Sequence, residues 1–262
     1  MTGVGATSRR AVVTGAGSGI GRAIALKLVE SGADVVVNDR DVDACEKVAA
    51  EIGAVAVPGD AAGDAGVKHL VAEARAHLGG IDVFFANAGV ETGAADSDED
   101  WALSWEVNVM SHVRAARELL PQWLEQGSGH LVCTVSAAGL LTMLGSAPYS
   151  ATKHAALGHA EWLAATYGRR GVTVQCICPL GVKTPMLPTE TAAGQVLLEG
   201  NVMEPEDLAD VVVRDLDGGE FLILPHPEVA GYYAGRAQDT TKWLHGMQKL
   251  QARIDELGRD SR

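Results

Sequence analysis

The sequence lacks any concentration of positive charge. Of its 262 residues, 21 are Lys or Arg and 34 are Asp or Glu, which gives a formal net charge of −13. Nucleic-acid binding requires clustered Lys and Arg side chains that contact phosphates. Nucleic acid is therefore not an expected partner, and the acidic excess is instead typical of a solvated surface that promotes solubility.

The sequence also lacks the patterns of a metal site or a disulfide framework. Its four cysteines form no Cys-x-x-Cys pair, and its eight histidines show no metal-ligand spacing, so no metal is expected. Cys133, Cys176 and Cys178 fall inside strand-like runs, where a free thiol packs as a small hydrophobic group. We therefore expect buried, reduced cysteines.

Long apolar runs are missing as well. None approaches the roughly 18 residues that a membrane-spanning helix needs, so no membrane partner is expected. No signal peptide is expected either, because Ser8-Arg9-Arg10 leads directly into the first strand-like run. These features predict a cytoplasmic location.

What the chain does contain is a regular alternation of strand-like and helical patterns. Hydrophobic residues make up 47% of the chain and glycines number 31, which suits a fold with many strand-to-helix turns. Such alternation predicts a parallel sheet covered by helices on both faces. With no linker or internal repeat, residues 1–262 are expected to form one domain. The predicted strands lie near residues 11–15, 34–39, 54–58, 82–86, 129–135, 172–178 and 220–224.

A glycine-rich turn follows the first predicted strand. The segment from Thr14 to Gly21 reads TGAGSGIG and opens into a helical pattern. This is the context that a dinucleotide-binding loop requires, because glycines let the backbone approach a pyrophosphate. The helix N-terminus then offers free N–H groups and a positive dipole end to the phosphates.

The second predicted strand ends in a carboxylate, Asp39. An acid about 20 residues beyond the glycine loop can accept hydrogen bonds from the ribose hydroxyls of NAD, and it repels the extra phosphate of NADP. Arg40, the next residue, could pair with that phosphate instead. We expect Asp39 to dominate, because it ends the strand where the ribose lies, and the sequence therefore predicts NAD.

Tyr149 and Lys153 lie four residues apart, with Ser136 thirteen residues upstream of the tyrosine. On a helix, side chains at i and i+4 share one face. A phenol titrates near pH 10 in water, and a nearby ammonium lowers that pKa. The pair therefore indicates a general acid/base, although an isolated pair of this kind is usually an ordinary helix-surface contact.

Taken together, these motifs resemble the short-chain dehydrogenase/reductase family, in the family's order and over roughly residues 9–185. Two departures are visible: Ala86 stands where the family often has Asn, and Leu180 where it usually has Gly. Neither removes a catalytic group. The matching positions are Thr14-Gly15-x-x-x-Gly19-x-Gly21, Asp60-Ala61, Asn87-Ala88-Gly89, Asn108, Ser136, Tyr149-x-x-x-Lys153 and Pro179 through Thr184.

The resemblance implies a doubly wound parallel sheet, the Rossmann fold, in an α/β single domain. It implies that Tyr149 moves the substrate proton, that Lys153 also holds the nicotinamide ribose, and that Ser136 hydrogen-bonds the substrate oxygen. Asn108 is expected to interrupt its helix and to hold a water linked to the lysine, as part of a proton relay. Besides Tyr149 and Lys153, the expected cofactor contacts are Gly15, Gly17, Ser18, Gly19, Ile20, Gly21, Asp39, Arg40, Asp60, Ala61, Asn87, Ala88, Gly89, Pro179, Val182 and Thr184.

Two positions in this scheme have a structural alternative. Asp60 is expected to accept from the adenine amino group, but Asp also favours helix N-caps, and a helical run begins near Asp64. Trp101 and Trp105 share a helix face, and we expect them to pack in the core or against another subunit rather than to bind a ligand.

The substrate is expected to contact two segments. Residues 140–144 form an apolar loop between Ser136 and Tyr149, for which core packing is the alternative. Residues 185–203 correspond to the lid that sets substrate choice in similar enzymes. The expected substrate contacts are Ser136, Leu140, Leu141, Met143, Leu144 and Met186.

A helical C-terminal extension is predicted at about residues 228–257. Trp243, Met247, Leu250 and Ile254 form one apolar stripe on it, and such a stripe must be buried somewhere. It could pack on its own domain, cap the substrate site or dock on another subunit. Similar enzymes are usually symmetric dimers or tetramers, so a homo-oligomer is expected.

The sequence therefore predicts an NAD(H)-dependent dehydrogenase acting on a small molecule, a lipophilic secondary alcohol or ketone. One alternative is a 3-oxoacyl thioester reductase, which would favour a basic cluster at the site mouth. Another is a regulator that binds NAD without turnover, which need not keep Ser136, Tyr149 and Lys153 together.

Overall fold

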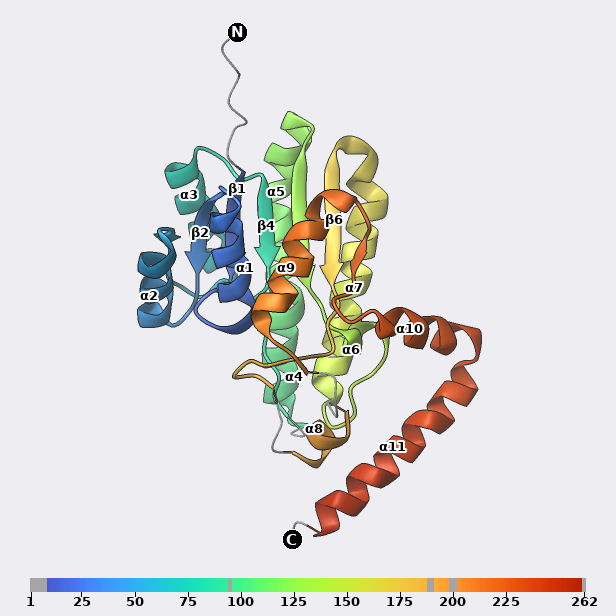
Figure 1. The fold of residues 1–262 in the computed structure, drawn as a ribbon. Helices are drawn as coiled ribbons and strands as arrows, with labels where there is room; N and C mark the ends of the chain where they lie inside the picture. The colour runs from blue at the N-terminus through green and yellow to red at the C-terminus, as the bar shows by residue number, and fades with distance from the viewer. Residues whose placement is uncertain (1–8, 94–95, 188–190, 198–201, 261–262) are drawn as a thin grey trace.

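The computed structural model describes residues 9–93, 96–187, 191–197 and 202–260. Within them, seven parallel strands form one sheet with the order β3-β2-β1-β4-β5-β6-β9 (Figure 1). The order runs outward from β1 on one side and from β4 on the other, which confirms the doubly wound Rossmann fold. The strands are β1 (Arg10–Thr14), β2 (Asp34–Asn38), β3 (Val55–Ala56), β4 (Val83–Ala86), β5 (Gly129–Thr134), β6 (Val172–Ile177) and β9 (Leu222–Ile223).

Helices cover both faces of this sheet. Local chemistry sets the first turn of some of them: the Asp41 side chain, for example, accepts from the Ala44 N–H at 3.0 Å as the N-cap of α2. The helices are α1 (Gly19–Glu30), α2 (Val42–Ile52), α3 (Asp64–Leu78), α4 (Asp98–Trp105), α5 (Ser111–Gln126), α6 (Ala137–Leu140), α7 (Ala147–Tyr167), α8 (Ala192–Leu197), α9 (Pro205–Asp215), α10 (Glu228–Gln238) and α11 (Thr240–Asp260).

The core lies in two layers, one on each face of the sheet. Val12 and Val36 point into the layer packed by α3, α5 and α7, whereas Val13 and Val37 point into the layer packed by α1, α2 and α9. Both faces are buried, which explains why the strands read as continuous apolar runs rather than as alternating ones. The four cysteines are free and buried, as the sequence predicted.

A small second sheet was not predicted. β7 (Gly181–Val182) pairs in parallel with β8 (Val202–Met203) beyond the end of β6. Two-residue strands are too short to show a periodic pattern in the sequence. No helix of the described part of the chain is long and apolar enough to cross a membrane.

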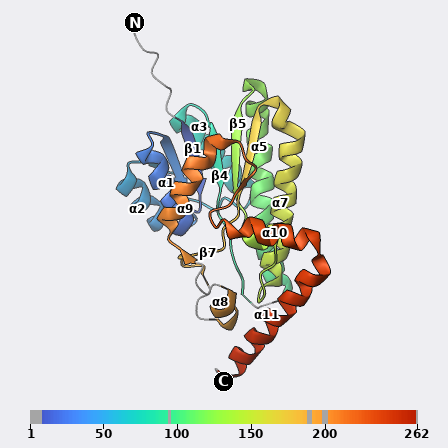
Figure 2. The same ribbon diagram turned by 45° about the vertical axis from the view of Figure 1, so that its right-hand side comes forward.

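The C-terminal extension is helical but not continuous. It consists of α10 and α11, which break at Asp239, whose Oδ1 accepts from the Lys242 N–H at 2.9 Å. α10 runs past α7, and α11 then turns back beneath the domain, where it packs against α8 (Figures 1 and 2). The extension therefore lies against its own domain, at the end of the sheet where the strands' carboxyl ends meet.

The two tryptophans of α4 do not pack in the core, so contact with another subunit, the other expectation for them, stays a prediction. Trp105 is 46% exposed, and the half-buried Trp101 donates its indole N–H to Asp96 at 2.6 Å. Only Ser104 of this helix is fully buried. α4 lies at the rim of the domain, so the face that carries both tryptophans is not turned to the core.

Candidate active site

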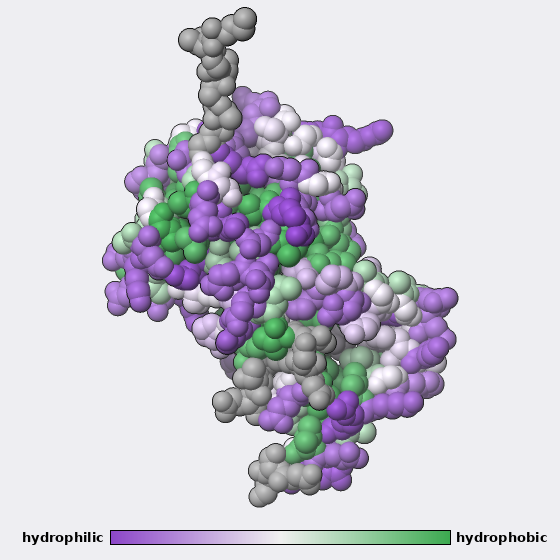
Figure 3. All heavy atoms as spheres, viewed as in Figure 1, coloured by the Kyte–Doolittle hydropathy of each residue, from purple (hydrophilic) through white to green (hydrophobic). Residues whose placement is uncertain are grey.

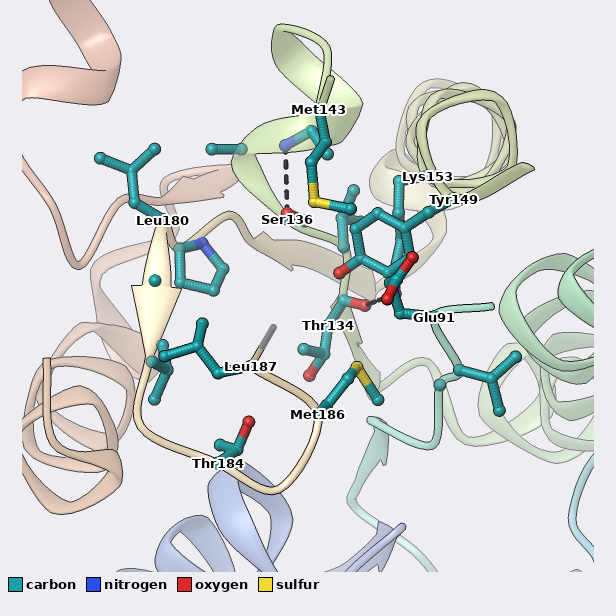
Figure 4. A pocket seen from close by; sticks show the side chains of 18 of the residues that line it. Glu91, Thr134, Ser136, Met143, Tyr149, Lys153, Leu180, Thr184, Met186 and Leu187 are labelled. Carbon is teal, nitrogen blue, oxygen red and sulfur yellow. Dashed lines mark hydrogen bonds between the residues drawn. The ribbon is translucent and has the colours of Figure 1, made fainter. Parts of the chain in front are cut away.

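A cavity of about 1800 Å³ opens at the carboxyl ends of the strands, where the order turns from β1 to β4. Ligands of open α/β sheets bind at this switch point. The cavity extends from the glycine loop past α7 to the inner face of α11. Ser136, Met143, Tyr149 and Lys153 gather on one side of it, opposite Leu180 (Figure 4).

The glycine loop is shaped to take a group that approaches the backbone closely. A Cβ on Gly21 would lie 2.1 Å from the Gly15 carbonyl oxygen, and Gly15 and Gly19 have φ angles of +62° and +52°. Ser18, the N-cap of α1, makes no side-chain capping bond, and the first turn of α1 carries no acid. The first N–H groups of the helix thus remain available to an anion, and these residues fit a dinucleotide phosphate.

Asp39 faces the same loop. Its Oδ2 accepts from the Gly17 N–H at 2.9 Å, and its Oδ1 accepts from the Asp41 N–H at 3.0 Å. Gly17 does not line the cavity, so its part is to hold the carboxylate rather than to contact a cofactor. Asp39 and Arg40 both line the cavity at the place expected for the adenosine ribose.

Asp60 lies at the next strand end. It lines the cavity together with Ala61, and its Oδ1 accepts from the Ala62 N–H at 2.9 Å. The N-cap of α3 is Gly63, so the alternative reading of Asp60 as a helix cap is wrong. Its carboxylate remains at the cavity wall, as an adenine contact requires.

Asn87 braces the strand ends around the glycine loop. Its Nδ2 donates to the Thr14 carbonyl at 2.9 Å, and its Oδ1 accepts from the Thr134 hydroxyl at 2.9 Å. The Thr14 hydroxyl in turn accepts from the N–H groups of Asn87 and Ala88 at 3.0 Å each. One amide therefore ties β1, β4 and β5 together, and Ala88 and Gly89 bring backbone to the cavity.

The third group of predicted residues converges beside β5. Lys153 is 3% exposed and its Nζ donates to the Thr134 carbonyl at 2.9 Å. The same Nζ lies 5.4 Å from the centroid of the Tyr149 ring. The Ser136 Oγ accepts from the Ala138 N–H at 3.0 Å, which points it into the cavity as the N-cap of α6. The serine, the phenol and the ammonium thus surround one volume.

Asn108 lies directly behind this group, in a π-helical turn (Glu106–Met110) between α4 and α5. Its Oδ1 accepts from the Val90 N–H at 2.9 Å, and its Nδ2 donates to the Val90 carbonyl at 2.9 Å. Nδ2 also donates to the Thr152 hydroxyl at 3.1 Å. The expected interruption of the helix is present, whereas the water-borne relay stays a prediction.

This arrangement matches a known family along most of the chain. The family model for short chain dehydrogenases matches residues 9–194. The chain belongs to the short-chain dehydrogenase family. It is therefore an oxidoreductase.

The relatives and solved structures agree with that assignment. The chain is 37% identical over 232 residues to a 1-deoxy-11-beta-hydroxypentalenate dehydrogenase of Streptomyces exfoliatus, covering 84% of each chain. It is 32% identical over 241 residues to a cyclohexanol dehydrogenase of an Acinetobacter species, covering 86% of this chain and 95% of the relative. A short-chain dehydrogenase/reductase of Burkholderia phymatum in complex with NAD is 30% identical, with a TM-score of 0.82 over 89% of this chain and 94% of that one.

A further solved structure is a 3-ketoacyl-(acyl-carrier-protein) reductase of Brucella melitensis complexed with NADH. It is 27% identical to this chain, with a TM-score of 0.76, and covers 82% of this chain and 94% of its own. Both of these structural neighbours were solved with a nicotinamide cofactor, which agrees with the fit of the glycine loop described above.

In this short-chain dehydrogenase, burial dominates the electrostatics of the catalytic pair. It lowers the pKa of Lys153 to about 8 and raises the pKa of Tyr149 to about 12, against the opposing effect of a hydrogen bond with Ser136. The direction for Tyr149 is opposite to the one predicted from the sequence. Desolvation of the phenol disfavours its charged form, and the Lys153 ammonium is directed at the Thr134 carbonyl.

Glu91 is a site residue that the sequence reasoning missed. Its side chain lies beside Tyr149 in the cavity (Figure 4), and its Oε1 accepts from the Gly93 N–H at 2.6 Å. The negative charge of this carboxylate also contributes to raising the pKa of Tyr149. The available signal was its place, two residues after Gly89 at the carboxyl end of β4.

The predicted substrate segments line the cavity, with one exception. Leu141, Met143, Leu144 and Met186 are at the wall. Leu140 is only 1% exposed and packs in the core below α6, so its expected substrate contact is wrong. The α6 turn places successive side chains on different sides, which sends this leucine inward.

The apolar loop at residues 140–144 is hydrogen-bonded to α7, the helix that carries Tyr149 and Lys153. The Ser150 hydroxyl accepts from the Met143 N–H and donates to the Met143 carbonyl, both at 3.0 Å. Of the expected lid, residues 188–190 and 198–201 lie outside the described residues. Leu187, from the predicted lid segment, and Leu180, from the matched segment before it, also line the cavity, although neither was named as a substrate contact.

Replacing Glu91 with Gln is expected to shift the pH dependence of alcohol oxidation. Removing the carboxylate charge lowers the pKa of Tyr149, because that charge disfavours the phenolate. The rise of kcat/KM with pH should therefore move to lower pH. Glu125→Gln, an exposed change on α5, serves as control; an unchanged profile in Glu91→Gln would show that the carboxylate does not act on Tyr149.

Proposed function

We propose that this short-chain dehydrogenase transfers a hydride between NAD(H) and a lipophilic secondary alcohol or ketone. The observation that carries the proposal is the convergence of Ser136, Tyr149 and Lys153 on one volume, beside a glycine loop that fits a dinucleotide. Hydride chemistry requires a carbinol or carbonyl carbon next to the nicotinamide. A serine and a tyrosine at that place supply hydrogen bonds to its oxygen.

The protein's own groups handle the proton. The Tyr149 phenolate accepts the alcohol proton in oxidation, the Tyr149 phenol returns that proton in reduction, and the Ser136 hydroxyl hydrogen-bonds the same substrate oxygen. The Lys153 ammonium favours the phenolate once the proton has left and stands where it can hold the nicotinamide ribose. When bound, the nicotinamide supplies the C4 position that accepts or releases the hydride.

Asn108 lies next to Lys153 in the place that a proton relay would need. A Cβ on Gly89 would lie 3.3 Å from the Asn108 Oδ1 and 3.4 Å from the Lys153 Nζ, so both polar atoms border the same small space. A water held there by the amide oxygen and the ammonium is the relay that we propose for proton exchange with solvent.

The preference for an apolar substrate follows from the walls. The cavity that contains the catalytic group is lined by the apolar side chains of Leu141, Met143, Leu144, Met186 and Leu187. Two relatives are named for alcohol substrates, 1-deoxy-11-beta-hydroxypentalenate and cyclohexanol. A substrate with an apolar body and one secondary hydroxyl or carbonyl fits this lining.

A 3-oxoacyl thioester reductase is a second candidate, because one structural neighbour carries a name of that class. A carrier phosphate would require clustered basic residues at the mouth. The basic residues of the described lining are Arg40, Lys153 and Lys242, which come from three separate places in the fold. A regulator without turnover is disfavoured by the retained catalytic group. A panel of alcohols, ketones and acyl thioesters followed by NADH absorbance separates the three.

Tyr149→Phe keeps the ring and removes the proton-transfer group. We expect kcat to fall by roughly 10²–10⁴-fold, with NADH binding largely retained in a fluorescence titration. Tyr167→Phe is the matched control, since Tyr167 lies at the far end of the same helix. Substantial turnover in Tyr149→Phe would remove Tyr149 from this role.

The choice of NAD over NADP is expected to depend on Asp39. Charge-assisted hydrogen bonds to the ribose are worth about 1.5–3 kcal/mol, so Asp39→Ala should lower kcat/KM for NAD by roughly tenfold or more and reduce the preference over NADP. Asp34→Ala, at the exposed opposite end of β2, is the control. A wild-type preference for NADP would instead show that Arg40 decides.

We also propose that the protein forms a homo-oligomer, a dimer or tetramer, in the cytoplasm. Symmetric association is the common solution for enzymes of this kind, and exposed aromatic residues on α4 and α7, Trp105 and Trp162, supply apolar surface for it. Light scattering on the purified protein should give a multiple of 27.3 kDa. A monomeric mass at micromolar concentration would contradict this proposal.

A further inference from the structure

The C-terminal extension supplies a wall of the substrate cavity. Trp243, Met247, Leu250 and Ile254, the stripe predicted from the sequence, all line it from α11. They are half-buried, whereas most other residues of α11 are exposed. In Figure 3, green apolar atoms appear along the side of this region that faces the domain, and the outer edge is purple.

The packing contacts of α11 involve few elements of the domain. It packs against the short helix α8 and against α10. α10 itself is anchored mainly at its start, where Val229 is fully buried and the His226 Nδ1 accepts from the Leu180 N–H at 3.2 Å. The far end of α10 and the whole of α11 therefore depend on contacts made beyond that anchor.

Arg236 makes those contacts, near the end of α10. Its Nη1 donates to the Leu140 carbonyl, to the Leu141 carbonyl at 3.0 Å, and to the His154 Nε2 at 2.9 Å. Its guanidinium also lies 5.1 Å from the ring centroid of Trp243, the first residue of the stripe. One side chain thus joins α10, α11, the substrate loop and the catalytic helix α7.

The state of His154 follows from its two partners. Its Nδ1 lies 2.8 Å from the Ser150 carbonyl, which can only accept, so this nitrogen carries the proton. Arg236 can only donate, so the Nε2 accepts. His154 therefore orients Arg236 and, although it follows Lys153 in the chain, faces away from the reacting group.

From these contacts we propose that Arg236 is a positioning residue that holds α11 across the substrate cavity. It thereby makes the enzyme prefer alcohols long enough to reach the α11 stripe. The preference rests on the proposed dehydrogenase function, because it concerns the substrate of the same site. The holding role itself concerns only the protein, and it can be measured without turnover.

The kinetic test compares 2-butanol with 2-decanol. In Arg236→Ala, KM for 2-decanol should rise by roughly tenfold or more, as expected for loss of hydrogen bonds to a charged group, and it should rise by a larger factor than KM for 2-butanol. Arg236→Lys should recover only part of the loss, because an ammonium lacks the planar fork and the stacking surface. Met247→Gln, which keeps volume but adds polarity, should raise KM for 2-decanol by a larger factor than KM for 2-butanol.

Arg259→Ala is the matched control, since Arg259 is exposed on α11 and donates to a carbonyl of its own helix. Hydrogen–deuterium exchange supplies the readout that needs no substrate. Exchange in α11 and in residues 140–145 should become faster in Arg236→Ala and not in the control. If the wild-type enzyme oxidised neither alcohol, the proposed function would be wrong. The exchange rates of α11 would then still show whether Arg236 holds this helix. Equal exchange, or an unchanged 2-decanol to 2-butanol ratio of KM in an active enzyme, overturns the proposal.

Discussion

The active site depends on one buried cation. Lys153 is 3% exposed, and its ammonium is held by the Thr134 carbonyl at the end of β5. A buried ammonium is costly unless it is hydrogen-bonded, so the surroundings must keep it satisfied while leaving it usable. Its lowered pKa, about 8, reflects this compromise. Burial makes the charged form of Lys153 only weakly favoured in the protein without a ligand, so a negative charge brought beside it would stabilise that form.

The neighbouring features follow from that requirement. A glycine suits position 89, because a Cβ there would crowd both the Lys153 ammonium and the Asn108 amide. Asn108 takes its position through the π-helical turn, which interrupts the helix so that the amide can satisfy both backbone groups of Val90. The Asn87 amide holds the ends of β1 and β5 at the distance that the site needs.

Much of this could be predicted from the sequence, since the determinants are local. Glycines with positive φ, an acid at a strand end and an i,i+4 pair each identify themselves by spacing, and the structure brings Gly15, Asp39 and Tyr149 to one cavity. The remainder depended on packing. The raised pKa of Tyr149 comes from desolvation, Leu140 turns inward at a short helix, and Trp105 is exposed at the rim. The contacts of Arg236 join residues more than 80 positions apart, which no local pattern encodes.

The small β7–β8 sheet has a consequence for how this enzyme can diversify. The pairing of Gly181 with Val202 and of Val182 with Met203 places the two ends of the intervening stretch side by side. The entropy of closing a stretch at its base grows only slowly with its length, so a longer stretch between these strands costs little stability. Changes in its length therefore need not move the large sheet, where the Thr134 carbonyl holds the catalytic lysine. The large sheet thus fixes the catalytic group, while the stretch closed by β7 and β8 contributes Thr184 and Met186 to the wall of the cavity.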